Sequence, residues 1–456
     1  MRLRVKDIVN ICHGELLFGD ENTYIENYSK DTRALNAGDC YIGIKGDNFD
    51  GNMLFEDAFN KGAGACILEN ESVNNYEFVN MGRPIILVDN AKEALKDIAS
   101  YIRDNSKALF IGVTGSVGKT STRDMIYSVV SKKYKSLKTE GNYNNDIGLP
   151  LTIMRLDKEE AAVIEMGMNN LGEIDYLTRI TKPHIAVITN VGTAHIGNLG
   201  SRKNILKAKL EIVNGLDKDG ILVINNDNDL LHEYYLKNND HVISVGINNL
   251  SDIMAKDINI LDDRVLFKIV YRDEEYECEC LVPNISFVYN SLIAFAVGIL
   301  SKVEIKDIIK GIKDVKLTSK RLEFINTKNL NIINDSYNAS LDSMRSSLDI
   351  LKNKKGRKVA ILGDMKELGS FSKKLHEEVG EYAAKCKIDL LVTIGEYASD
   401  IENGALKEGF TNIKTFNNKD EFINNINGYI KRGDNVLVKA SNSLKFWEIV
   451  KVLEDF

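Results

Sequence analysis

The chain has 456 residues, of which 44% are hydrophobic and 27% are charged, and its formal net charge is −7. These proportions are typical of folded protein and exclude a disordered chain, a collagen-like repeat and a coiled-coil rod. At about 150 residues per domain, the length predicts three domains. Because the charge balance is acidic, a protein that coats nucleic acid is disfavoured, and we expect no nucleic-acid partner.

The most apolar stretch of the chain, residues 292–300, is far shorter than the about 20 residues that a membrane-spanning helix needs. The first residues, MRLRVKD, are rich in charge, and no apolar core of a signal peptide follows them. We therefore expect a cytoplasmic protein without membrane insertion. In that compartment the six cysteines are interpreted as reduced thiols.

Short apolar runs separated by turns, as at 40–44 and 65–68, predict a small mixed α/β domain at the start of the chain. From residue 108 the pattern changes, because ALFIGV predicts a buried strand, a Gly-rich loop follows, and residues 120–131 predict a helix. Apolar runs without alternation indicate a parallel sheet covered on both faces. Further runs of this kind occur at 161–164, 185–189 and 221–224.

A second series of buried runs begins after residue 317, with predicted helices such as 373–385 between the strands. This alternation predicts a separate doubly wound, Rossmann-like domain. The sequence therefore predicts an α/β protein with a small N-terminal domain over 1–106, a central parallel-sheet P-loop domain over 107–316 and a Rossmann-like domain over 317–456. The strands expected in the last domain are 330–333, 359–362, 390–394 and 436–438.

The sharpest local motif is GVTGSVGKT, residues 112–120, between a predicted strand and a predicted helix. Glycines let backbone N–H groups approach phosphate oxygens, and the helix N-terminus favours an anion. Lys119 can reach the β- and γ-phosphates, and the Thr120 hydroxyl can bind Mg²⁺. The usual GxxxxGK[ST] spacing is not met, because Val113 takes the place of the first glycine. The residues predicted to bind the nucleotide phosphates are Thr114, Gly115, Ser116, Val117, Gly118, Lys119 and Thr120.

Two further polar residues follow predicted strands of the same sheet. Glu165 ends the run AAVIE, where a carboxylate can hold Mg²⁺, and His195 follows the next strand in NVGTAH. Each residue alone is compatible with an ordinary strand end or a surface histidine. Because ligands bind at the carboxyl edge of parallel sheets, their common placement favours a shared site with the phosphate loop.

These residues resemble, in the same order, the ATP-dependent Mur ligases of peptidoglycan synthesis. The motifs that carry the resemblance are TGSVGKT, GNYNNDIGLP, the Glu165 strand, NVGTAH and KAKLEI (207–212). LGDMKELGSFSKKLHEEVG (362–380) is most similar to the family members that add a dipeptide. SKDTRALNAGDCYIGIKGDNFDG (29–51) and VLVKASNSLKFWEIV (436–450) resemble the first and last domains of those members, so that the likeness covers nearly the whole chain.

The resemblance implies that ATP, UDP-N-acetylmuramoyl-tripeptide and D-alanyl-D-alanine give a UDP-sugar pentapeptide, ADP and phosphate through an acyl phosphate. It implies catalytic roles for Lys119, Glu165, His195 and Lys209, with Thr120, Glu165 and His195 at the metal. Lys209 matches a lysine that CO₂ carbamylates in this family, and the carbamate is an anion able to hold a second Mg²⁺. The further positions that the likeness assigns to the nucleotide are Asn145, Asn290, Arg321, Asp335 and Asn338, and those that it assigns to the uridine-diphosphate part of the precursor are Ser29, Asp31 and Arg33.

The stretch PNISFVYN, residues 283–290, departs from the family, whose usual run is PG, one variable residue and then HN. Asn284 replaces the glycine, Ser286 the histidine and Phe287 the first asparagine, and phenylalanine cannot make the hydrogen bonds of that asparagine to the nucleotide. Ser340 and Leu341 likewise replace an Asn-Pro pair, and Ala440 a common glycine. The departures predict an altered affinity for adenine.

Several alternatives stay open at this point. One is a relative that uses a different amine or carboxylate substrate, and another is a catalytically weak paralogue that only binds the precursor. A P-loop GTPase or kinase is a third, although it leaves both flanking domains unexplained. The sequence does not decide whether the third residue of the peptide is lysine or diaminopimelate. We expect a monomer.

Overall fold

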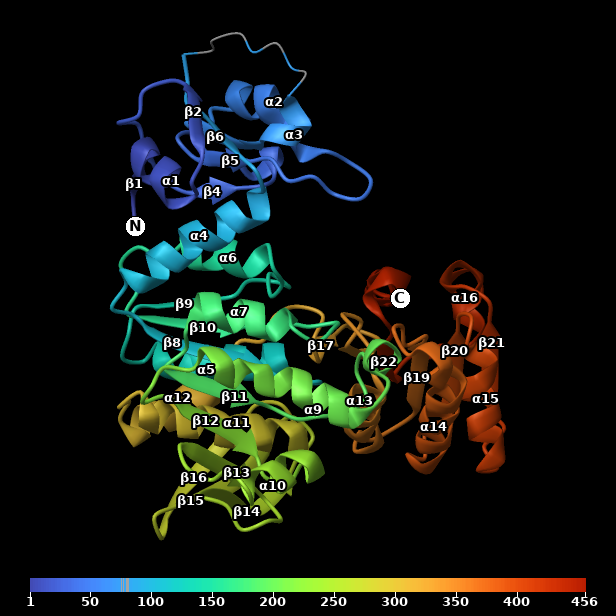
Figure 1. Ribbon diagram of the computed structural model, residues 1–456. Coiled ribbons are helices and arrows are strands. Elements are labelled where there is room, and N and C mark those ends of the chain that lie inside the picture. Colours follow the sequence, from blue (N-terminus) through green and yellow to red (C-terminus); the bar gives the residue numbers. More distant parts are fainter. Residues whose placement is uncertain (75, 77, 79–81) are drawn as a thin grey trace.

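The computed structural model describes residues 1–74, 76, 78 and 82–456, which form three α/β domains (Figure 1). The N-terminal domain lies at one end of the central domain, and the C-terminal domain lies beside it. The α/β class and the three-domain organisation predicted from the sequence are confirmed. All six cysteines belong to the described part of the chain and are buried free thiols.

The N-terminal domain has a five-stranded sheet of order β2-β7-β6-β5-β4 and a small β1-β3 ladder. The sheet is parallel except for β2, which pairs antiparallel with β7. Helix α4 connects the sheet to the central domain and packs against α6. The strands are β1 Leu3–Arg4, β2 Glu15–Phe18, β3 Tyr24–Ile25, β4 Tyr28–Ser29, β5 Cys40–Ile42, β6 Ala65–Glu69 and β7 Ile85–Val88, and the helices are α1 Val5–Ile11, α2 Phe55–Asn60, α3 Asn70–Val73 and α4 Ala91–Asp104.

The central domain is built on a nine-stranded sheet of order β16-β15-β14-β13-β12-β11-β8-β10-β9. Strands β8 to β14 pair in parallel, as the unbroken apolar runs predict. The strands are β8 Leu109–Thr114, β9 Ser136–Lys138, β10 Ala161–Glu165, β11 Ile185–Ile188, β12 Ile221–Asn225, β13 Val242–Gly246, β14 Ile253–Ile260, β15 Val265–Tyr271 and β16 Glu274–Cys280. The helices are α5 Lys119–Val130, α6 Gly148–Met154, α7 Glu173–Thr181, α8 Ile196–Leu199, α9 Arg202–Leu210, α10 Asp229–Tyr235, α11 Ile285–Leu300 and α12 Ile305–Lys313.

Strands β14, β15 and β16 form an antiparallel meander that the sequence prediction did not include. Their exposure alternates along the chain, with apolar residues of β15 such as Phe267 and Ile269 buried and Leu266 exposed. Such alternation is typical of antiparallel strands with one face in solvent, and it differs from the continuous runs that marked the parallel strands. Helices α5, α11 and α12 cover the core on one face of the sheet.

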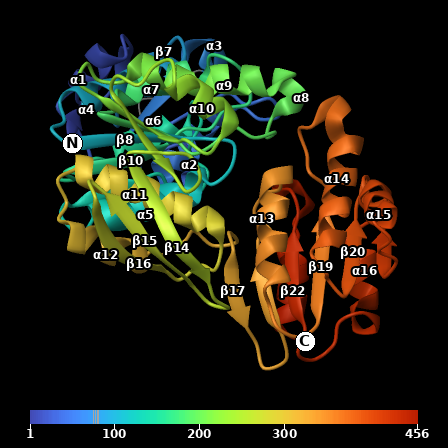
Figure 2. The same cartoon turned by 90° about the horizontal axis from the view of Figure 1, so that it is seen from below.

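The C-terminal domain has a six-stranded sheet of order β17-β18-β22-β19-β20-β21, parallel except for the edge strand β17. This is the predicted doubly wound arrangement. Figure 2 shows α13 on the side of the domain that faces the central domain. The strands are β17 Glu323–Asn326, β18 Asn331–Asn334, β19 Lys358–Gly363, β20 Leu390–Ile394, β21 Ile413–Phe416 and β22 Asn435–Lys439, and the helices are α13 Leu341–Lys352, α14 Ser372–Lys385, α15 Ala398–Lys407, α16 Lys419–Asn425 and α17 Trp447–Glu454.

The central and C-terminal domains are in contact close to the phosphate loop. The N–H of Gly197 in α8 donates to the carbonyl of Glu367 at 3.2 Å. A side chain at Gly197 would collide with the backbone of Leu368 and Gly369, so glycine is needed for this close approach. Among the residues that the structure describes, no helix is both long and apolar enough to cross a membrane.

Candidate active site

The phosphate loop connects β8, in the middle of the central sheet, to α5. Gly115 and Gly118 have φ values of +153° and +81°, which favour glycine. A Cβ at Gly115 would lie 1.9 Å from Oγ1 of Thr189, so the loop can pass over the end of β11 only with glycine there. The side chain of Asn190 accepts from the Val117 N–H at 2.9 Å and fixes the loop from the neighbouring strand end. The sequence-predicted loop therefore lies at the carboxyl edge of the sheet, between β10 and β11.

Lys119 and Thr120 begin helix α5 and point back toward this loop. Nζ of Lys119 donates to the Gly115 carbonyl at 2.8 Å, and burial lowers the pKa of Lys119 despite the nearby carboxylate of Glu165. Oγ1 of Thr120 donates to Oε2 of Glu165 at 3.0 Å. The structure thus brings the predicted lysine, hydroxyl and carboxylate together at one point. Amine and oxygen groups of these types suit a phosphate and a divalent cation.

Glu165 is 1% exposed and is held by two residues that the sequence analysis did not single out. Nη1 of Arg123 donates to its Oε2 at 3.1 Å, and Nδ2 of Asn144 donates to its Oε1 at 2.8 Å. The predicted neighbour Asn145 is exposed and instead accepts from the N–H of Gly148 at the start of α6. Arg123 could have been predicted from GKTSTRDM, because a residue one helical turn after Lys119 lies on the same face of α5, beside the loop.

Arg123 also connects Glu165 to the beginning of the C-terminal domain. Its Nη2 donates to Asp124 at 2.8 Å and to Oγ1 of Thr318 at 2.7 Å, and the N–H of Thr318 donates to Asp124 at 2.8 Å. Arg123 and Asp124 are both buried, at 0% and 1% exposure. Burial raises the pKa of Asp124, but the charges of Arg123 and Lys138 outweigh it and hold this pKa below its usual value.

Lys209, on α9, is 1% exposed. Within the described part of the chain it has neither a hydrogen-bond acceptor nor an ionic partner for Nζ. Burial, with a smaller effect of the Lys119 charge, lowers the pKa of Lys209 well below its usual value. Burial therefore favours the neutral amine over the ammonium, and the neutral amine is the form that can react with CO₂.

His195 precedes α8 in a left-handed conformation, with φ of +63°. Its Nδ1 lies 2.6 Å from Oε2 of Glu367, which belongs to the C-terminal domain. This contact lowers the pKa of Glu367. Glu367 lies in the LGDMKELG run, so the segment on which the family likeness was most specific touches the NVGTAH loop. In the structure His195 bridges the two domains, and its assignment to a metal stays a prediction.

The nucleotide residues predicted in the C-terminal domain surround a buried ion pair. Lys439, 1% exposed, donates to Asp335 and, at 2.9 Å, to the carbonyl of Asn338. Arg321 stacks on the ring of Tyr337, 3.9 Å from its centroid. Lys439 was missed in the sequence analysis because a lysine that ends a strand gives no signal by itself.

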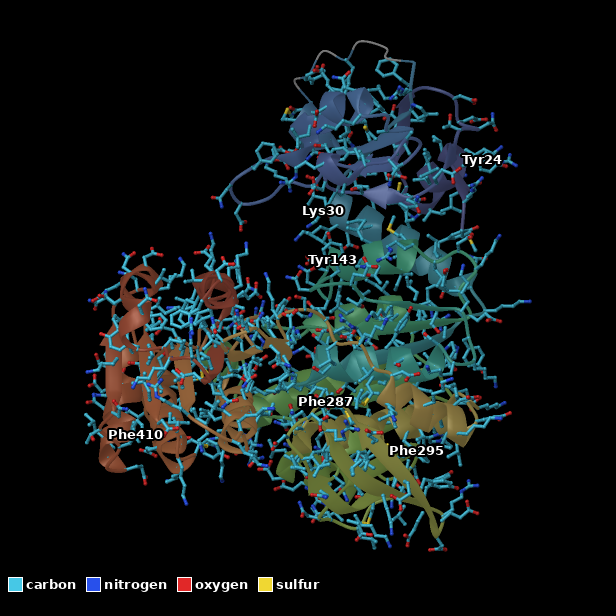
Figure 3. The ribbon with its side chains drawn as sticks, turned by 180° about the vertical axis from the view of Figure 1, so that it is seen from behind. Tyr24, Lys30, Tyr143, Phe287, Phe295 and Phe410 are labelled. Atoms are coloured by element: carbon cyan, nitrogen blue, oxygen red, sulfur yellow. The ribbon has the colours of Figure 1, made fainter. Side chains whose placement is uncertain are left out.

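Asn290 and the neighbouring departures from the family lie at the start of α11. Oδ1 of Asn290 accepts from Thr122 of α5 at 3.0 Å. Asn284 caps α11 and donates to the carbonyl of Ser346 in α13 at 2.8 Å. Phe287 is 2% exposed and packs into the core of the central domain, where Figure 3 labels it together with Phe295. The departing residues thus contact the protein interior and the C-terminal domain.

The three residues predicted to hold the uridine diphosphate form one turn in the N-terminal domain. Asp31 accepts from the N–H of Arg33 at 2.9 Å and forms an ion pair with its guanidinium at 2.7 Å. This pairing lowers the pKa of Asp31 to about 2. Oγ of Ser29 accepts from the N–H of Asp31 at 3.1 Å. The side chain of Arg33 is exposed, and the role of this turn in binding stays a prediction.

A P-loop beside a buried strand-end carboxylate, faced by a second doubly wound domain, defines a multidomain nucleotide-dependent enzyme. Family models match the chain in three segments, namely the Mur ligase family catalytic domain at 24–103, the Mur ligase middle domain at 113–298 and the Mur ligase glutamate ligase domain at 320–442. The chain belongs to the Mur ligase family.

Relatives match over almost the whole length. A Bacillus subtilis protein named UDP-N-acetylmuramoyl-tripeptide–D-alanyl-D-alanine ligase is 37% identical, with 98% of each chain covered. The Escherichia coli protein of the same name is 30% identical, with 99% of this chain and 98% of that chain covered. Among solved structures, MurF from Acinetobacter baumannii superposes with a TM-score of 0.90 at 28% identity, covering 100% of this chain and 99% of that one. MurF ligase from Thermotoga maritima in complex with ADP has a TM-score of 0.82 at 27% identity, covering 94% and 97%.

Proposed function

We propose that the chain joins D-alanyl-D-alanine to UDP-N-acetylmuramoyl-tripeptide with the consumption of ATP, as its relatives are named to do. The observation that carries the proposal is the cluster of Lys119, Thr120 and Glu165 at the phosphate loop, in a chain that matches those relatives from end to end. ADP in the Thermotoga maritima structure supports the use of ATP.

The proposed reaction has two steps. The terminal carboxylate of the tripeptide attacks the γ-phosphorus of ATP, an O–P bond forms, and ADP leaves. The amine of the dipeptide then attacks the acyl carbon, a C–N bond forms, phosphate leaves and the amine loses a proton. A carboxylate by itself is a poor acyl donor because its leaving group would be oxide, and the first step replaces oxide by phosphate.

The task of the loop residues is to position the reacting phosphates and to neutralise their negative charge. This is the main task of a protein in phosphoryl transfer. Lys119 places its ammonium on the β- and γ-phosphates, and the loop N–H groups bind their oxygens. Thr120 and Glu165 offer oxygens of the kind that Mg²⁺ prefers, and a carboxylate with a hydroxyl and substrate phosphates suffices for that ion. These two side chains would hold Mg²⁺, whose positive charge would stabilise the negative charge on the transferring phosphate. Arg123 and Asn144 fix the orientation of Glu165.

Lys209 is the candidate for a carbamate. Its burial and its lowered pKa support this assignment, because only an unprotonated amine adds to CO₂. The carbamate would supply the anion for a second Mg²⁺. The acyl phosphate hydrolyses in water, so contacts of the C-terminal domain, such as Glu367 on His195, serve to close the site during turnover.

The experiment measures phosphate release from ATP and Mg²⁺ with UDP-N-acetylmuramoyl-tripeptide and D-alanyl-D-alanine supplied separately and together. We expect release only with both, and a pentapeptide product by mass spectrometry. Tripeptides with lysine and with diaminopimelate at the third position, assayed in parallel, identify the precursor. Lys119→Met should abolish turnover, with precursor binding retained as the control for folding. Precursor binding without phosphate release in the unaltered chain would favour the weak paralogue, and release with another amine would favour a different acceptor.

A further inference from the structure

The linker between the central and C-terminal domains consists of residues 314–322, between α12 and β17. Figure 1 shows β17 on the side of the C-terminal domain that adjoins the central domain. Thr318 in this linker is held by α5, because its N–H and its Oγ1 both donate to Oδ2 of Asp124 at 2.8 Å. As far as Thr318, the linker is therefore fixed to the central domain.

From Lys320 onward the linker is fixed to the C-terminal domain. The N–H of Lys320 donates to Glu323 at 3.2 Å, and its carbonyl accepts from the N–H of Tyr337 at 3.1 Å. Lys320 and Leu322 have φ values of +64° and +49°, and such left-handed backbone at residues other than glycine is typical of switch segments. Ser319, which is exposed, is the residue between the contacts to the two domains.

Arg123 connects the central-domain side of this linker to Glu165. Its Nε and Nη2 donate to Asp124 at 3.2 and 2.8 Å, and Nη2 donates also to Oγ1 of Thr318 at 2.7 Å. Its Nη1 donates to Glu165 at 3.1 Å and to the carbonyl of Gly141 at 3.3 Å. All five N–H groups of the guanidinium are thus used, and the side chain is 0% exposed. A change of charge at one acceptor therefore changes how strongly the guanidinium is bound by the others.

A stabilising role alone does not require this arrangement. Asp124 supplies the carboxylate that a buried guanidinium needs, and it binds Lys138 as a second cation. Arg123 in addition shares Oε2 of Glu165 with the hydroxyl of Thr120, which belongs to the phosphate loop. One buried side chain therefore contacts both the predicted metal-binding carboxylate and the linker that carries the next domain.

We propose that Arg123 is a positioning residue that couples cation binding at Glu165 to the placement of the C-terminal domain through Thr318. The inference rests on the proposed function, because it takes Glu165 as a ligand of Mg²⁺. When Glu165 binds a divalent cation, less of its negative charge acts on Arg123, and the guanidinium is held more firmly by Asp124 and Thr318. Such coupling is reciprocal, so firmer anchoring of Thr318 raises the affinity of Glu165 for the cation.

Titration calorimetry with ADP, in the presence and absence of Mg²⁺, measures the contribution of the cation without turnover. Thr318→Val keeps the β-branched shape but leaves a buried N–H of Arg123 without its acceptor, so that the guanidinium moves toward the carboxylates. Glu165 is then more fully neutralised by Arg123. We expect the gain in ADP affinity caused by Mg²⁺ to fall about fivefold or more, which is the size of a typical coupling between sites.

The affinity for ADP without Mg²⁺ should not change in Thr318→Val, which separates coupling from a general structural effect. Thr318→Ser keeps the hydroxyl and should retain the full gain caused by Mg²⁺. Ser319→Ala is the matched control in the same linker, because the hydroxyl of Ser319 lies beside Glu323, at 3.5 Å, on the side fixed to the C-terminal domain. It should behave like the unaltered chain.

Hydrogen exchange of a peptide spanning residues 314–322 tests the reverse direction of the coupling and needs no substitution. With ADP present, Mg²⁺ should slow exchange of the Thr318 N–H in the unaltered chain. The inference is overturned if this exchange does not respond to Mg²⁺, or if Thr318→Val has the same gain in ADP affinity as the unaltered chain. Phosphate release that requires both substrates would then leave the proposed function standing. If Mg²⁺ has no effect on the ADP affinity of the unaltered chain, the assignment of Glu165 and this inference are overturned together.

Discussion

Replacement of Arg123 by methionine tests whether the buried network behind Glu165 stabilises the central domain. The guanidinium is 0% exposed and donates to Glu165 at 3.1 Å, to Asp124 at 2.8 Å and to Thr318 at 2.7 Å. Methionine keeps much of the volume of the side chain but has no charge and no donor. The variant therefore leaves two buried carboxylates without their shared cation.

The expected cost follows from the partners that each carboxylate keeps. Removing one member of a buried ion pair costs about 3–5 kcal/mol. Asp124 retains Nζ of Lys138 at 2.7 Å and the N–H of Thr318 at 2.8 Å, and Glu165 retains the hydroxyl of Thr120 and the amide of Asn144. Because both carboxylates keep donors, we expect the lower end of that range, about 3 kcal/mol.

The pH dependence of this cost has a definite sign. Arg123 and Lys138 hold the pKa of Asp124 below its usual value against the effect of burial. The ionised carboxylate therefore stabilises the fold at neutral pH, and this contribution is lost as the pH falls through the folded-state pKa. Without Arg123 the effect of burial gains weight, the pKa of Asp124 rises, and protonation relieves part of the penalty. The difference between variant and unaltered chain should therefore be smaller at an acidic pH than at pH 7.

Amide hydrogen exchange measures the effect domain by domain, which a single unfolding transition of a three-domain chain does not. Peptides from α5 and β10 should exchange roughly 100-fold faster in Arg123→Met at pH 7, as expected from about 3 kcal/mol. Peptides from the C-terminal sheet serve as an internal reference. Arg155→Met, which removes an exposed ion pair with Glu140, is the matched control and should cost about 1 kcal/mol or less. A difference below about 1 kcal/mol for Arg123→Met, or one that is equal at both pH values, would refute the reasoning.

Three further predictions concern the loop, the domain contact and Lys209. Gly115→Ala should abolish the rise in melting temperature caused by ADP, because its Cβ would collide with Thr189. Gly428→Ala, with open space around it and no positive φ, should retain that rise. In the unaltered chain the ionised carboxylate of Glu367, whose pKa is lowered by His195, should hold the two domains together until an acidic pH protonates it. The radius of gyration measured by X-ray scattering should therefore depend on pH in the unaltered chain. Glu367→Gln should remove this dependence. ¹³C-bicarbonate should give a carbamate resonance in the unaltered chain and in Lys207→Met but none in Lys209→Met, and a signal that persists in the last variant would contradict the assignment.

The central part of the fold could be predicted because its signals are local. Buried parallel strands are continuous apolar runs, and a Gly-rich loop between a strand and a helix has few other interpretations. The positions of Lys119, Thr120 and Glu165 followed, since the carboxyl ends of neighbouring parallel strands meet at one edge. The antiparallel meander β14–β16 was not predicted because its alternating pattern differs from those runs.

The partners of the site residues could not be predicted in the same way. Arg123 meets Thr318 across 195 positions of sequence, and His195 meets Glu367 only after two domains have packed together. Asn144 and Asn145 are adjacent in GNYNND, and only the backbone course before α6 decides that Asn144 faces Glu165. Such contacts depend on tertiary geometry, for which spacing along the chain carries no signal.

The departures from the family at the start of α11 have a structural consequence that the sequence alone did not indicate. The altered affinity for adenine stays a prediction, and Phe287 itself is 2% exposed within the core of the central domain. Asn284 and Ser286 instead lie against Ser346, with Nδ2 of Asn284 donating to its carbonyl at 2.8 Å and the two serine hydroxyls 3.4 Å apart. Since Ser346 belongs to α13, these substitutions connect α11 to the C-terminal domain. We therefore expect these substitutions to affect the position of the C-terminal domain as well as the affinity for adenine.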